Sequence, residues 1–298
     1  MNTLRELIDH SRIEKIDTRV LLTHLCQEIL NWPKSSLITR DTEVLPYEFL
    51  KSWHELEDRR LLGEPVAYLV GHRGFYDIDL KVAPGVLIPR PETELLVDLA
   101  LQEIKRIIEQ TQTTEQSSLK HKIRVLDLGT GSGAIALAIA DAFRTTWGSH
   151  SDLEVTAVDQ SDQALNIAKE NCQRLGLDKL VHFFKSDWFC ELEPSSQSFD
   201  MIVGNPPYIA NNDPHLLEGD LRFEPRSALT DGADGLEAYR AILKSARKFM
   251  RSNALIALEH GYDQGIMIKN LFSDHGLVEL SMIKDIAGQD RVMMGRAP

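Results

Sequence analysis

The sequence predicts an α/β protein whose main part is a doubly wound, largely parallel β-sheet, with a small helical domain in front of it. Three observations support this class. Short apolar runs alternate with helical patterns from residue 123 onward, which implies right-handed crossovers between parallel strands. A glycine-rich turn at residues 129–133 joins the first of these runs to an alanine-rich helical pattern. Residues 1 to about 75 show helical periodicity instead.

The N-terminal region, residues 1–75, is predicted to be a small helical domain. Residues 18–26 present an apolar face, and Asp17 is the expected N-cap of that helix. A second amphipathic helix is expected over residues 47–62 and is stopped by Gly63. No pattern in this region indicates catalysis, so it is expected to dock a partner or simply to pack.

A β-hairpin is expected to link the two domains. Residues 68–71 and 75–82 are predicted as its arms, and the Ala-Pro-Gly sequence at residues 83–85 closes it. We therefore set residues 76–90 as the linker and residues 91–298 as the second domain.

The second domain is predicted to contain strands and helices in alternation. The expected strands are residues 123–128, 154–159, 181–184, 201–203, 254–259, 278–283 and 291–294. The expected helices are residues 91–108, 134–140, 163–175 and 239–249. The last two strands should form a terminal pair antiparallel to the rest of the sheet. The Gln/Thr/Ser-rich residues 110–118 are expected to be an exposed connector.

Composition limits the classes of function. With 298 residues, 43% hydrophobic and 26% charged, the chain is expected to be soluble and globular. No apolar run reaches the roughly 20 residues that span a bilayer, and no signal peptide is visible, so a cytoplasmic location without membrane contact is expected. The cysteines and histidines have no metal-ligand spacing, so no metal site is expected.

The net charge bears on the partner. A formal charge of −12 argues against a nucleic-acid substrate, because binding to nucleic acid usually needs a basic face. It is compatible with a basic protein partner.

Four consecutive predicted strands each end in a distinctive motif. The first leads to the glycine turn, the second ends in Asp159, the third leads to residues 187–188, and the fourth leads to residues 205–208. Ligands of open α/β sheets bind beyond the carboxyl ends of the strands, so the motifs are expected to form one site. Glycines let a ligand approach the backbone, and an acid after the second strand can accept hydrogen bonds from ribose hydroxyls.

The fourth motif, Asn205-Pro206-Pro207-Tyr208, follows the buried run at residues 201–203. Proline cannot continue a strand and holds the corner stiff. The Asn205 side-chain oxygen and the Pro206 carbonyl supply the two acceptors that an NH2 group needs, and Tyr208 offers a flat face for a planar group. The motif predicts a clamp for a planar amino or amide nitrogen. The alternative is a rigid turn that only closes the strand.

The other three motifs also have simpler interpretations. The glycine turn fits the Gly-x-Gly-x-x-Ala fingerprint of nicotinamide cofactors. Against that, Asp159 lies 28 residues beyond Gly131, more than the usual ~20, and no residue set downstream suggests hydride chemistry. Read alone, Asp159 and Asp187 could cap helices, and Trp188 could be a core residue.

Together the motifs resemble class I S-adenosylmethionine methyltransferases, and more closely the HemK/PrmC family of protein-(glutamine-N5) methyltransferases that act on peptide chain release factors. Amino-methylating enzymes of DNA and RNA share the Asn-Pro-Pro-Tyr motif, so residues 88–94 and the helical domain select this family. Gly204 and His260 depart from the family pattern, in which serine and an apolar residue are expected. The similar stretches are residues 63–68, 88–94, 127–136, 157–159, 186–189, 205–209, 223–225 and 234–236.

The resemblance implies a Rossmann-like sheet of seven strands, mostly parallel with one antiparallel strand, and S-adenosyl-L-methionine as the cofactor. It implies that the cofactor is bound by Gly129, Thr130, Gly131, Ser132, Gly133, Asp159, Trp188 and Asn205. The substrate would be bound by Asn205, Pro206, Pro207 and Tyr208, with catalytic roles for Asn205 and Pro206. Arg90, Glu92 and Thr93 would either order a lid over the cofactor or cap a helix.

The implied reaction transfers a methyl group to the side-chain nitrogen of the glutamine in the Gly-Gly-Gln motif of release factors, in support of translation termination. A monomer without direct nucleic-acid binding is expected. One alternative is an N-methyltransferase acting on DNA adenine or rRNA guanine. The other is a catalytically idle domain that binds the methyl donor and serves as a scaffold.

Overall fold

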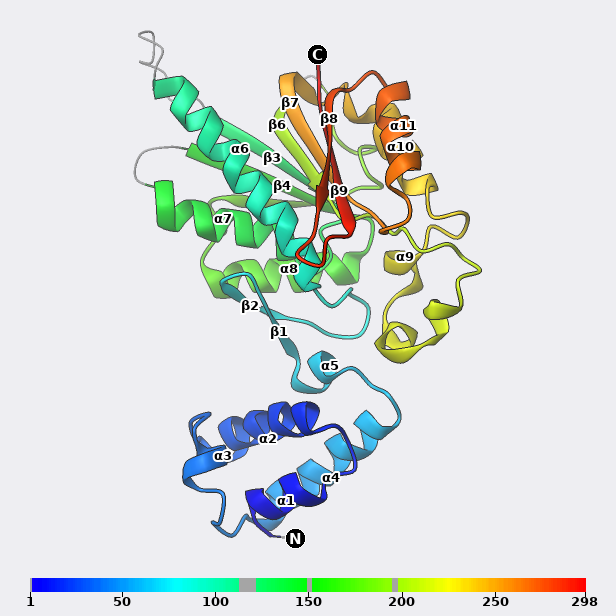
Figure 1. Ribbon diagram of the computed structural model, residues 1–298. Coiled ribbons are helices and arrows are strands. Elements are labelled where there is room, and N and C mark those ends of the chain that lie inside the picture. Colours follow the sequence, from blue (N-terminus) through cyan, green and yellow to red (C-terminus); the bar gives the residue numbers. More distant parts are fainter. Residues whose placement is uncertain (1, 113–121, 149–151, 195–197) are drawn as a thin grey trace. The chain divides into compact units, whose positions relative to one another are not determined.

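The computed structural model describes residues 2–112, 122–148, 152–194 and 198–298 (Figure 1). The chain forms two compact units, which are described separately. The first unit comprises Met1–His72 and Leu217–Phe223, and the second comprises Arg73–Leu216 and Glu224–Pro298. The connector expected at residues 110–118 lies largely outside the described residues.

The first unit is helical. Its helices are α1 (Leu4–His10), α2 (Lys15–Leu30), α3 (Ser36–Thr39), α4 (Tyr47–Leu61) and α5 (Val66–Val70). The apolar stripes of α2 and α4 meet in a core that buries Leu21, Leu22, Phe49 and Trp53.

Two sequence predictions for this unit are wrong. The N-cap of α2 is Glu14, and Asp17 lies inside the first turn, where it accepts a hydrogen bond from Arg60 at 2.7 Å. The arm predicted at residues 68–71 is helix α5, because Pro65 starts a turn of helix there and Gly71 ends it in the left-handed conformation.

The segment Leu217–Phe223 joins the first unit although it comes from the middle of the chain. It contains the 3₁₀-helix η3 (Gly219–Phe223). Arg60 donates to Asp220 at 3.1 Å and to Asp17 at 2.7 Å, so one guanidinium holds the segment and α2 together.

The hairpin consists of β1 (His72–Phe75) and β2 (Ile78–Lys81). Asn171, which is fully buried, holds β2 in place. It accepts from the Lys81 backbone N–H at 2.7 Å and donates to the carbonyls of Lys81 and Ser132, each at 3.0 Å. The same side chain therefore supports the hairpin and the glycine turn.

The second unit contains the predicted seven-stranded sheet. Its strands are β3 (Lys122–Leu128), β4 (Asp152–Asp159), β5 (Val181–Lys185), β6 (Phe199–Gly204), β7 (Met250–Glu259), β8 (Val278–Lys284) and β9 (Asp290–Arg296), in the spatial order β5-β4-β3-β6-β7-β9-β8. Only β9 runs antiparallel to its neighbours. A single antiparallel strand is thus confirmed, but a terminal pair opposed to the rest is wrong, since helix α11 returns the chain so that β8 runs with the parallel strands.

Helices cover both faces of the sheet (Figure 1). On one face lie α6 (Glu94–Gln112), α7 (Ala134–Trp147) and α8 (Asp162–Leu175), and on the other α10 (Glu237–Ala246) and α11 (Gly265–Asp274). Successive strand residues point to opposite faces, so Val125 belongs to one core and Leu126 to the other. The remaining short elements are η1 (Pro91–Thr93), η2 (Pro214–Leu217) and α9 (Arg226–Leu229).

From β3 the chain adds β4 and β5 on one side of the sheet, and then crosses to add β6 and β7 on the other side. Open α/β sheets bind ligands at this switch point, between β3 and β6. Leu128 at the end of β3 pairs with Gly204 at the end of β6. The glycine turn and Asn205 therefore leave the sheet side by side. A Cβ on Gly204 would lie 2.9 Å from the Leu128 carbonyl oxygen, so the serine expected there would force a shift.

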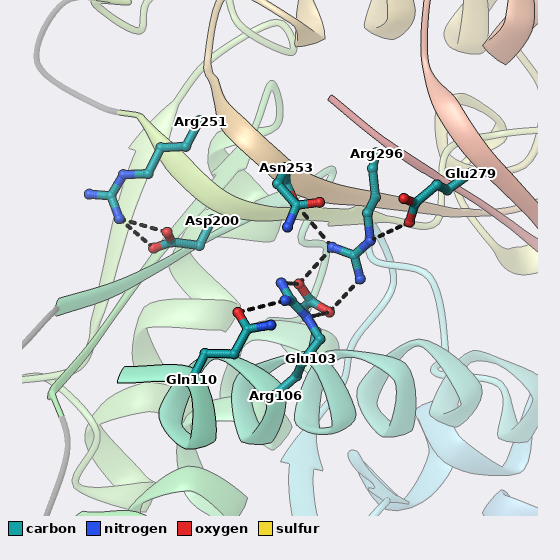
Figure 2. Close-up of polar contacts among 8 residues, drawn as sticks. All are labelled: Glu103, Arg106, Gln110, Asp200, Arg251, Asn253, Glu279 and Arg296. Atoms are coloured by element: carbon teal, nitrogen blue, oxygen red, sulfur yellow. Dashed lines mark hydrogen bonds and ion pairs between the residues drawn. The ribbon is translucent and has the colours of Figure 1, made fainter. Parts of the chain in front are cut away.

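Helix α6 is fastened to the sheet by a polar cluster (Figure 2). Glu103 accepts two hydrogen bonds from Arg296 on β9, at 2.7 and 2.8 Å, and two from Arg106, at 2.6 and 2.9 Å. Its side chain is almost fully buried, so the ion pairs are shielded from solvent. Nearby, Asp200 on β6 pairs with Arg251 on β7 at 2.6 Å.

Candidate active site

A cavity of about 990 Å³, measured to its open mouth, lies at the carboxyl ends of β3, β4 and β6 in the second unit. The predicted residues that line it are Gly129, Thr130, Gly131, Ser132, Asp159, Asp187, Trp188, Asn205 and Pro207. Of the three residues expected to order a lid or cap a helix, Arg90 and Thr93 also line it and Glu92 does not. Gln160, Pro225, Ser227 and Ala228 complete this part of the lining.

The glycine turn owes its shape to left-handed backbone. Gly129, Gly131 and Gly133 have φ of 70°, 58° and 87°, a region that side chains strongly disfavour. The Val158 carbonyl accepts the backbone N–H groups of Gly129 and Thr130, both at 2.9 Å, which fixes the turn to β4. A Cβ on Gly131 would meet nothing within 4 Å, so the backbone there is open to a ligand.

Asp127, which the sequence reasoning did not select, supports the turn from beneath. It is fully buried and accepts from Thr130 Oγ1 at 2.6 Å and from the Ala136 backbone N–H at 3.3 Å. Its Oδ1 has no hydrogen-bond partner among the described residues, and burial raises the pKa of this carboxyl to about 7. An acid two residues before a glycine turn was the available signal.

Asp159 lies at the end of β4, as predicted. Its Oδ2 accepts the Gly131 backbone N–H and its Oδ1 accepts the Ser161 backbone N–H, both at 2.9 Å. Burial raises the pKa of this carboxyl, while the backbone donors oppose the shift. Each oxygen keeps a lone pair that can accept a hydroxyl from a ligand.

Trp188 borders the cavity beside the glycine turn. Its ring lies 3.5 Å from the position that a Cβ on Gly129 would occupy. The residue has a positive φ of 51°, and Ser186 stabilises this conformation by donating its hydroxyl to the Trp188 carbonyl at 2.8 Å. The result is a flat apolar wall with Asp187 next to it.

Asn205 follows the fully buried strand β6. Its Nδ2 donates to Thr93 Oγ1 at 3.1 Å, and no described side chain donates to its Oδ1. Pro207 also lines the cavity, whereas Pro206 is buried behind it.

Tyr208 is an anchor for this corner and is not among the residues that line the cavity. Its hydroxyl donates to Glu259 Oε1 at 3.4 Å, and its carbonyl accepts from Gln264 Nε2 at 2.9 Å. Burial next to Glu259 raises the pKa of the phenol.

The residues 88–94 meet the segment that follows the Asn-Pro-Pro-Tyr loop. Arg90 forms an ion pair with the buried Glu224, which also accepts the Ile88 backbone N–H at 2.9 Å. Residues 223–225 are among the stretches similar to the family, and the resemblance implies no role for Glu224. Arg90 and Thr93 border the cavity, and Arg90 is the N-cap residue of η1 without a side-chain cap hydrogen bond.

His260 and Tyr262 do not line the cavity. His260 is fully buried, with Nδ1 2.8 Å from the Gly261 carbonyl and Nε2 3.1 Å from Met282 Sδ. Tyr262 is 64% exposed. No group of three or more His, Cys, Asp or Glu side chains within the described ranges could hold a metal ion.

The cavity residues fit S-adenosylmethionine. The glycine turn is open at Gly131, Asp159 offers free lone pairs to ribose hydroxyls, and the Trp188 ring suits a planar base. The buried, unpartnered Oδ1 of Asp127 lies under the turn, where an ammonium group would find an acceptor.

Solved structures with a similar fold are methyltransferases. The catalytic domain of hMettl16 in complex with an RNA hairpin is 17% identical, covers 81% of each chain and has a TM-score of 0.53. The delta-N METTL16 methyltransferase domain is 18% identical, covers 82% of this chain and 96% of that chain, and has a TM-score of 0.50. The second unit therefore has the class I methyltransferase fold.

The sequence comparisons are more specific. The family described as "Methyltransferase small domain" matches residues 109–219, and the family described as "PrmC N-terminal domain" matches residues 3–71. The release factor glutamine methyltransferase of Burkholderia pseudomallei is 41% identical over 99% of this chain and 96% of its own length. Those of Xylella fastidiosa and Pseudomonas aeruginosa are 42% and 41% identical, and cover 96% and 99% of this chain and 94% and 99% of their own lengths. This chain belongs to the release factor glutamine methyltransferase family.

The resemblance inferred from the motifs is thus confirmed. Within the described ranges, no helix combines the length and apolar character that a membrane crossing requires.

Proposed function

We propose that the protein transfers a methyl group from S-adenosyl-L-methionine to the side-chain amide nitrogen of the glutamine in the Gly-Gly-Gln motif of peptide chain release factors. Relatives of full length and about 41% identity carry the name of this activity. The single structural observation that carries the proposal is the Asn205 amide, tied through Nδ2 to Thr93 at the wall of the cavity. The side-chain oxygen of Asn205 is left to accept an N–H from the substrate amide.

The cofactor side of the site is assigned to residues 129–133, Asp159, Trp188 and Asn205. The methyl donor supplies an activated methyl group on a sulfonium, so the protein needs to bind and align rather than to activate it. The glycine turn takes the methionine part, Asp159 accepts the ribose hydroxyls, and the Trp188 ring borders the adenine.

The substrate side is assigned to residues 205–208, with Asn205 and Pro206 as the catalytic pair. An amide nitrogen is a poor nucleophile because its lone pair is delocalised into the carbonyl. Asn205 Oδ1 and the Pro206 carbonyl can accept both N–H groups of the substrate amide. Electron density then shifts toward the amide nitrogen, and the nitrogen lone pair is held in one orientation. Alignment of this kind can supply about 7–11 kcal/mol. Pro207 and Tyr208 keep the corner rigid.

We propose further that residues 1–75 dock the release factor, that residues 76–90 link them to the catalytic domain, and that residues 91–298 perform the transfer. The net charge of −12 suits a basic protein partner and disfavours nucleic acid. A monomer in the cytoplasm, where release factors act, is the proposed working form.

The proposal is tested by incubating the protein with labelled donor and, in separate reactions, a release factor, the same factor with its Gly-Gly-Gln glutamine replaced by alanine, DNA, and ribosomal RNA. Label should enter only the intact release factor. Label in DNA or RNA and none in the release factor would overturn the assignment.

The Asn205→Ala variant tests the clamp. It should lose at least about 100-fold in transfer at saturating donor, because the aligned acceptor is gone, while it still folds. Calorimetry with S-adenosylmethionine and circular dichroism provide the two controls. Transfer near the wild-type rate would refute the role given to Asn205.

A further inference from the structure

Gln264, in the segment after β7, is a buried amide that binds backbone groups around the Asn-Pro-Pro-Tyr corner. Only 6% of the residue is exposed. Its Nε2 donates to the Tyr208 carbonyl at 2.9 Å and to the Gly235 carbonyl at 3.2 Å. Its Oε1 accepts the Gly261 backbone N–H at 2.9 Å. One side chain therefore ties together three backbone segments that follow the ends of β6 and β7.

The orientation of this amide is determined by its partners. A backbone N–H can only donate and a backbone carbonyl can only accept, so the oxygen must face Gly261 and the nitrogen must face the two carbonyls. The Gln264 backbone N–H also donates to the Gly261 carbonyl at 2.9 Å, so these two residues are joined by a reciprocal pair of hydrogen bonds. The reversed amide would set its oxygen against two carbonyl oxygens.

Gly235 packs directly against the same carbonyl. Its φ is 81°, and a Cβ there would lie 2.3 Å from the Tyr208 carbonyl oxygen and 2.9 Å from Gln264 Nε2. A side chain at this position would force the backbone to shift. The Tyr208 carbonyl is thus held in two independent ways, by the hydrogen bond from Gln264 and by close backbone packing.

The Tyr208 carbonyl ends a stretch of backbone that has little freedom of its own. At the start of the stretch, Asn205 follows the last paired residue of β6 and is tied to Thr93. Between the two ends, the rings of Pro206 and Pro207 lock their φ angles. No described donor reaches the Pro206 carbonyl. Its direction therefore depends on how the two ends of the stretch are held.

We propose that Gln264 is a positioning residue that acts through the Tyr208 carbonyl to place the Pro206 carbonyl as the second acceptor of the substrate amide. The inference rests on the proposed function, since a substrate NH2 group is what needs two acceptors in fixed positions. Gln264 does not line the cavity, so its effect on transfer is indirect. A misplacement of the corner by about 1 Å is enough to slow transfer strongly.

The first test is Gln264→Met, which keeps the length of the side chain and removes both donors. With donor and release factor both saturating, kcat should fall about 10-fold or more, because the Pro206 carbonyl is no longer held toward the substrate. The Kd for S-adenosylmethionine, measured by calorimetry, should change by less than about 2-fold, since the glycine turn and Asp159 are unaltered.

Asn171→Leu is the matched control. It also replaces a buried amide that joins two carbonyls and one backbone N–H, those of Lys81 and Ser132, at the glycine turn. Both variants should lose similar stability, since each leaves the same kinds of polar group without a partner. Their kinetic effects should differ. Asn171→Leu should raise the Kd for the donor and keep kcat at saturating donor near the wild-type value.

A second pair of variants alters the Tyr208 carbonyl without changing Gln264. Gly232 has the same φ of 81° as Gly235, but a Cβ on it would meet nothing within 4 Å. Gly232→Ala and Gly235→Ala therefore introduce the same backbone strain, and Gly235→Ala adds the collision with the Tyr208 carbonyl. Relative to Gly232→Ala, Gly235→Ala should lower kcat about 10-fold or more at an equal donor Kd. This pair decides the matter if Gln264→Met does not fold.

Circular dichroism at the assay temperature shows whether each variant is folded. A folded Gln264→Met with the wild-type kcat would overturn the proposal, as would a loss of kcat matched by an equal loss of donor affinity. Equal kcat values for Gly235→Ala and Gly232→Ala would overturn it as well. These results are separate from the proposed function, which depends on transfer to the release factor by the wild type.

Discussion

The polar side chains of the site are oriented by neighbours that are distant in sequence. Asp159 is held by the backbone N–H of Gly131, 28 residues earlier, and Asn205 by Thr93, 112 residues earlier. Fixed donors and acceptors of this kind need no reorganisation when a ligand arrives, which is the basis of catalysis by alignment.

Asp159→Asn should weaken donor binding. The change removes the negative charge and leaves one acceptor oxygen, which costs about 1.5–3 kcal/mol for hydrogen bonds to a charged group, or roughly 10- to 100-fold in Kd. Isothermal calorimetry with S-adenosylmethionine measures it. The control is Asp162→Asn, in which the replaced side chain is largely exposed and pairs only with Lys185. An unchanged Kd in Asp159→Asn would remove the ribose assignment.

The site is predicted from residues that end strands, and the parallel strands bring several of these residues to one edge of the sheet. Asp159, Trp188 and Asn205 all line the cavity. Glu224 was missed, because its partners Ile88 and Arg90 lie more than a hundred residues away in the sequence and only folding reveals those contacts. No local pattern marks a buried carboxyl as functional.

Among the elements, α6 is joined to β9 by the carboxylate of Glu103 as well as by apolar packing. The Glu103 carboxylate accepts hydrogen bonds from both Arg106 and Arg296 (Figure 2). Loss of one member of a buried ionic group leaves the others desolvated without a counter-charge.

Glu103→Gln should therefore lower the free energy of unfolding by about 1–3 kcal/mol. Urea denaturation followed by circular dichroism measures the change. Glu109→Gln is the matched control on the same helix, since Glu109 is exposed and lies 3.8 Å from Lys105, so its effect should stay within about 0.5 kcal/mol. Equal effects of the two substitutions would mean that the cluster adds nothing to stability.

Element type was predictable for long periodic segments and not for short ones. Residues 68–71 are too few to show a period, and Pro65 and Gly71, which determine the helical turn there, lie at its edges. The direction of β8 depends on the crossover through α11, which the spacing of two apolar runs does not reveal.

Across the molecule, the chain passes between the two units more than once. It does so after His72 and again on either side of Leu217–Phe223. Sequence reasoning divided the chain at one linker because composition changes there, whereas the assignment of residues 217–223 to the helical unit depends on contacts such as Arg60 with Asp220.

Arg60→Ala should release this segment, because Arg60 is the guanidinium that binds both Asp17 and Asp220. Trypsin should then cleave after Arg222 several-fold faster, as shown by mass spectrometry of the fragments. Arg59→Ala is the control, since Glu64 is the one ion-pair partner of Arg59 within the described part of the chain. Cleavage at an unchanged rate would show that other contacts hold the segment.

The position of Trp188 gives the protein a built-in optical reporter. Of the four tryptophans, Trp188 is the one whose ring forms a wall of the cavity. Trp32 and Trp53 belong to the helical unit, and Trp147 packs against Phe143 at the end of α7. Indole emission responds to the polarity around the ring, so a change in intrinsic fluorescence should follow the methyl donor into its site without any label. The rates of donor binding and dissociation can thus be measured by stopped flow on the native chain. Trp188→Phe, which lacks the reporting indole, is the control.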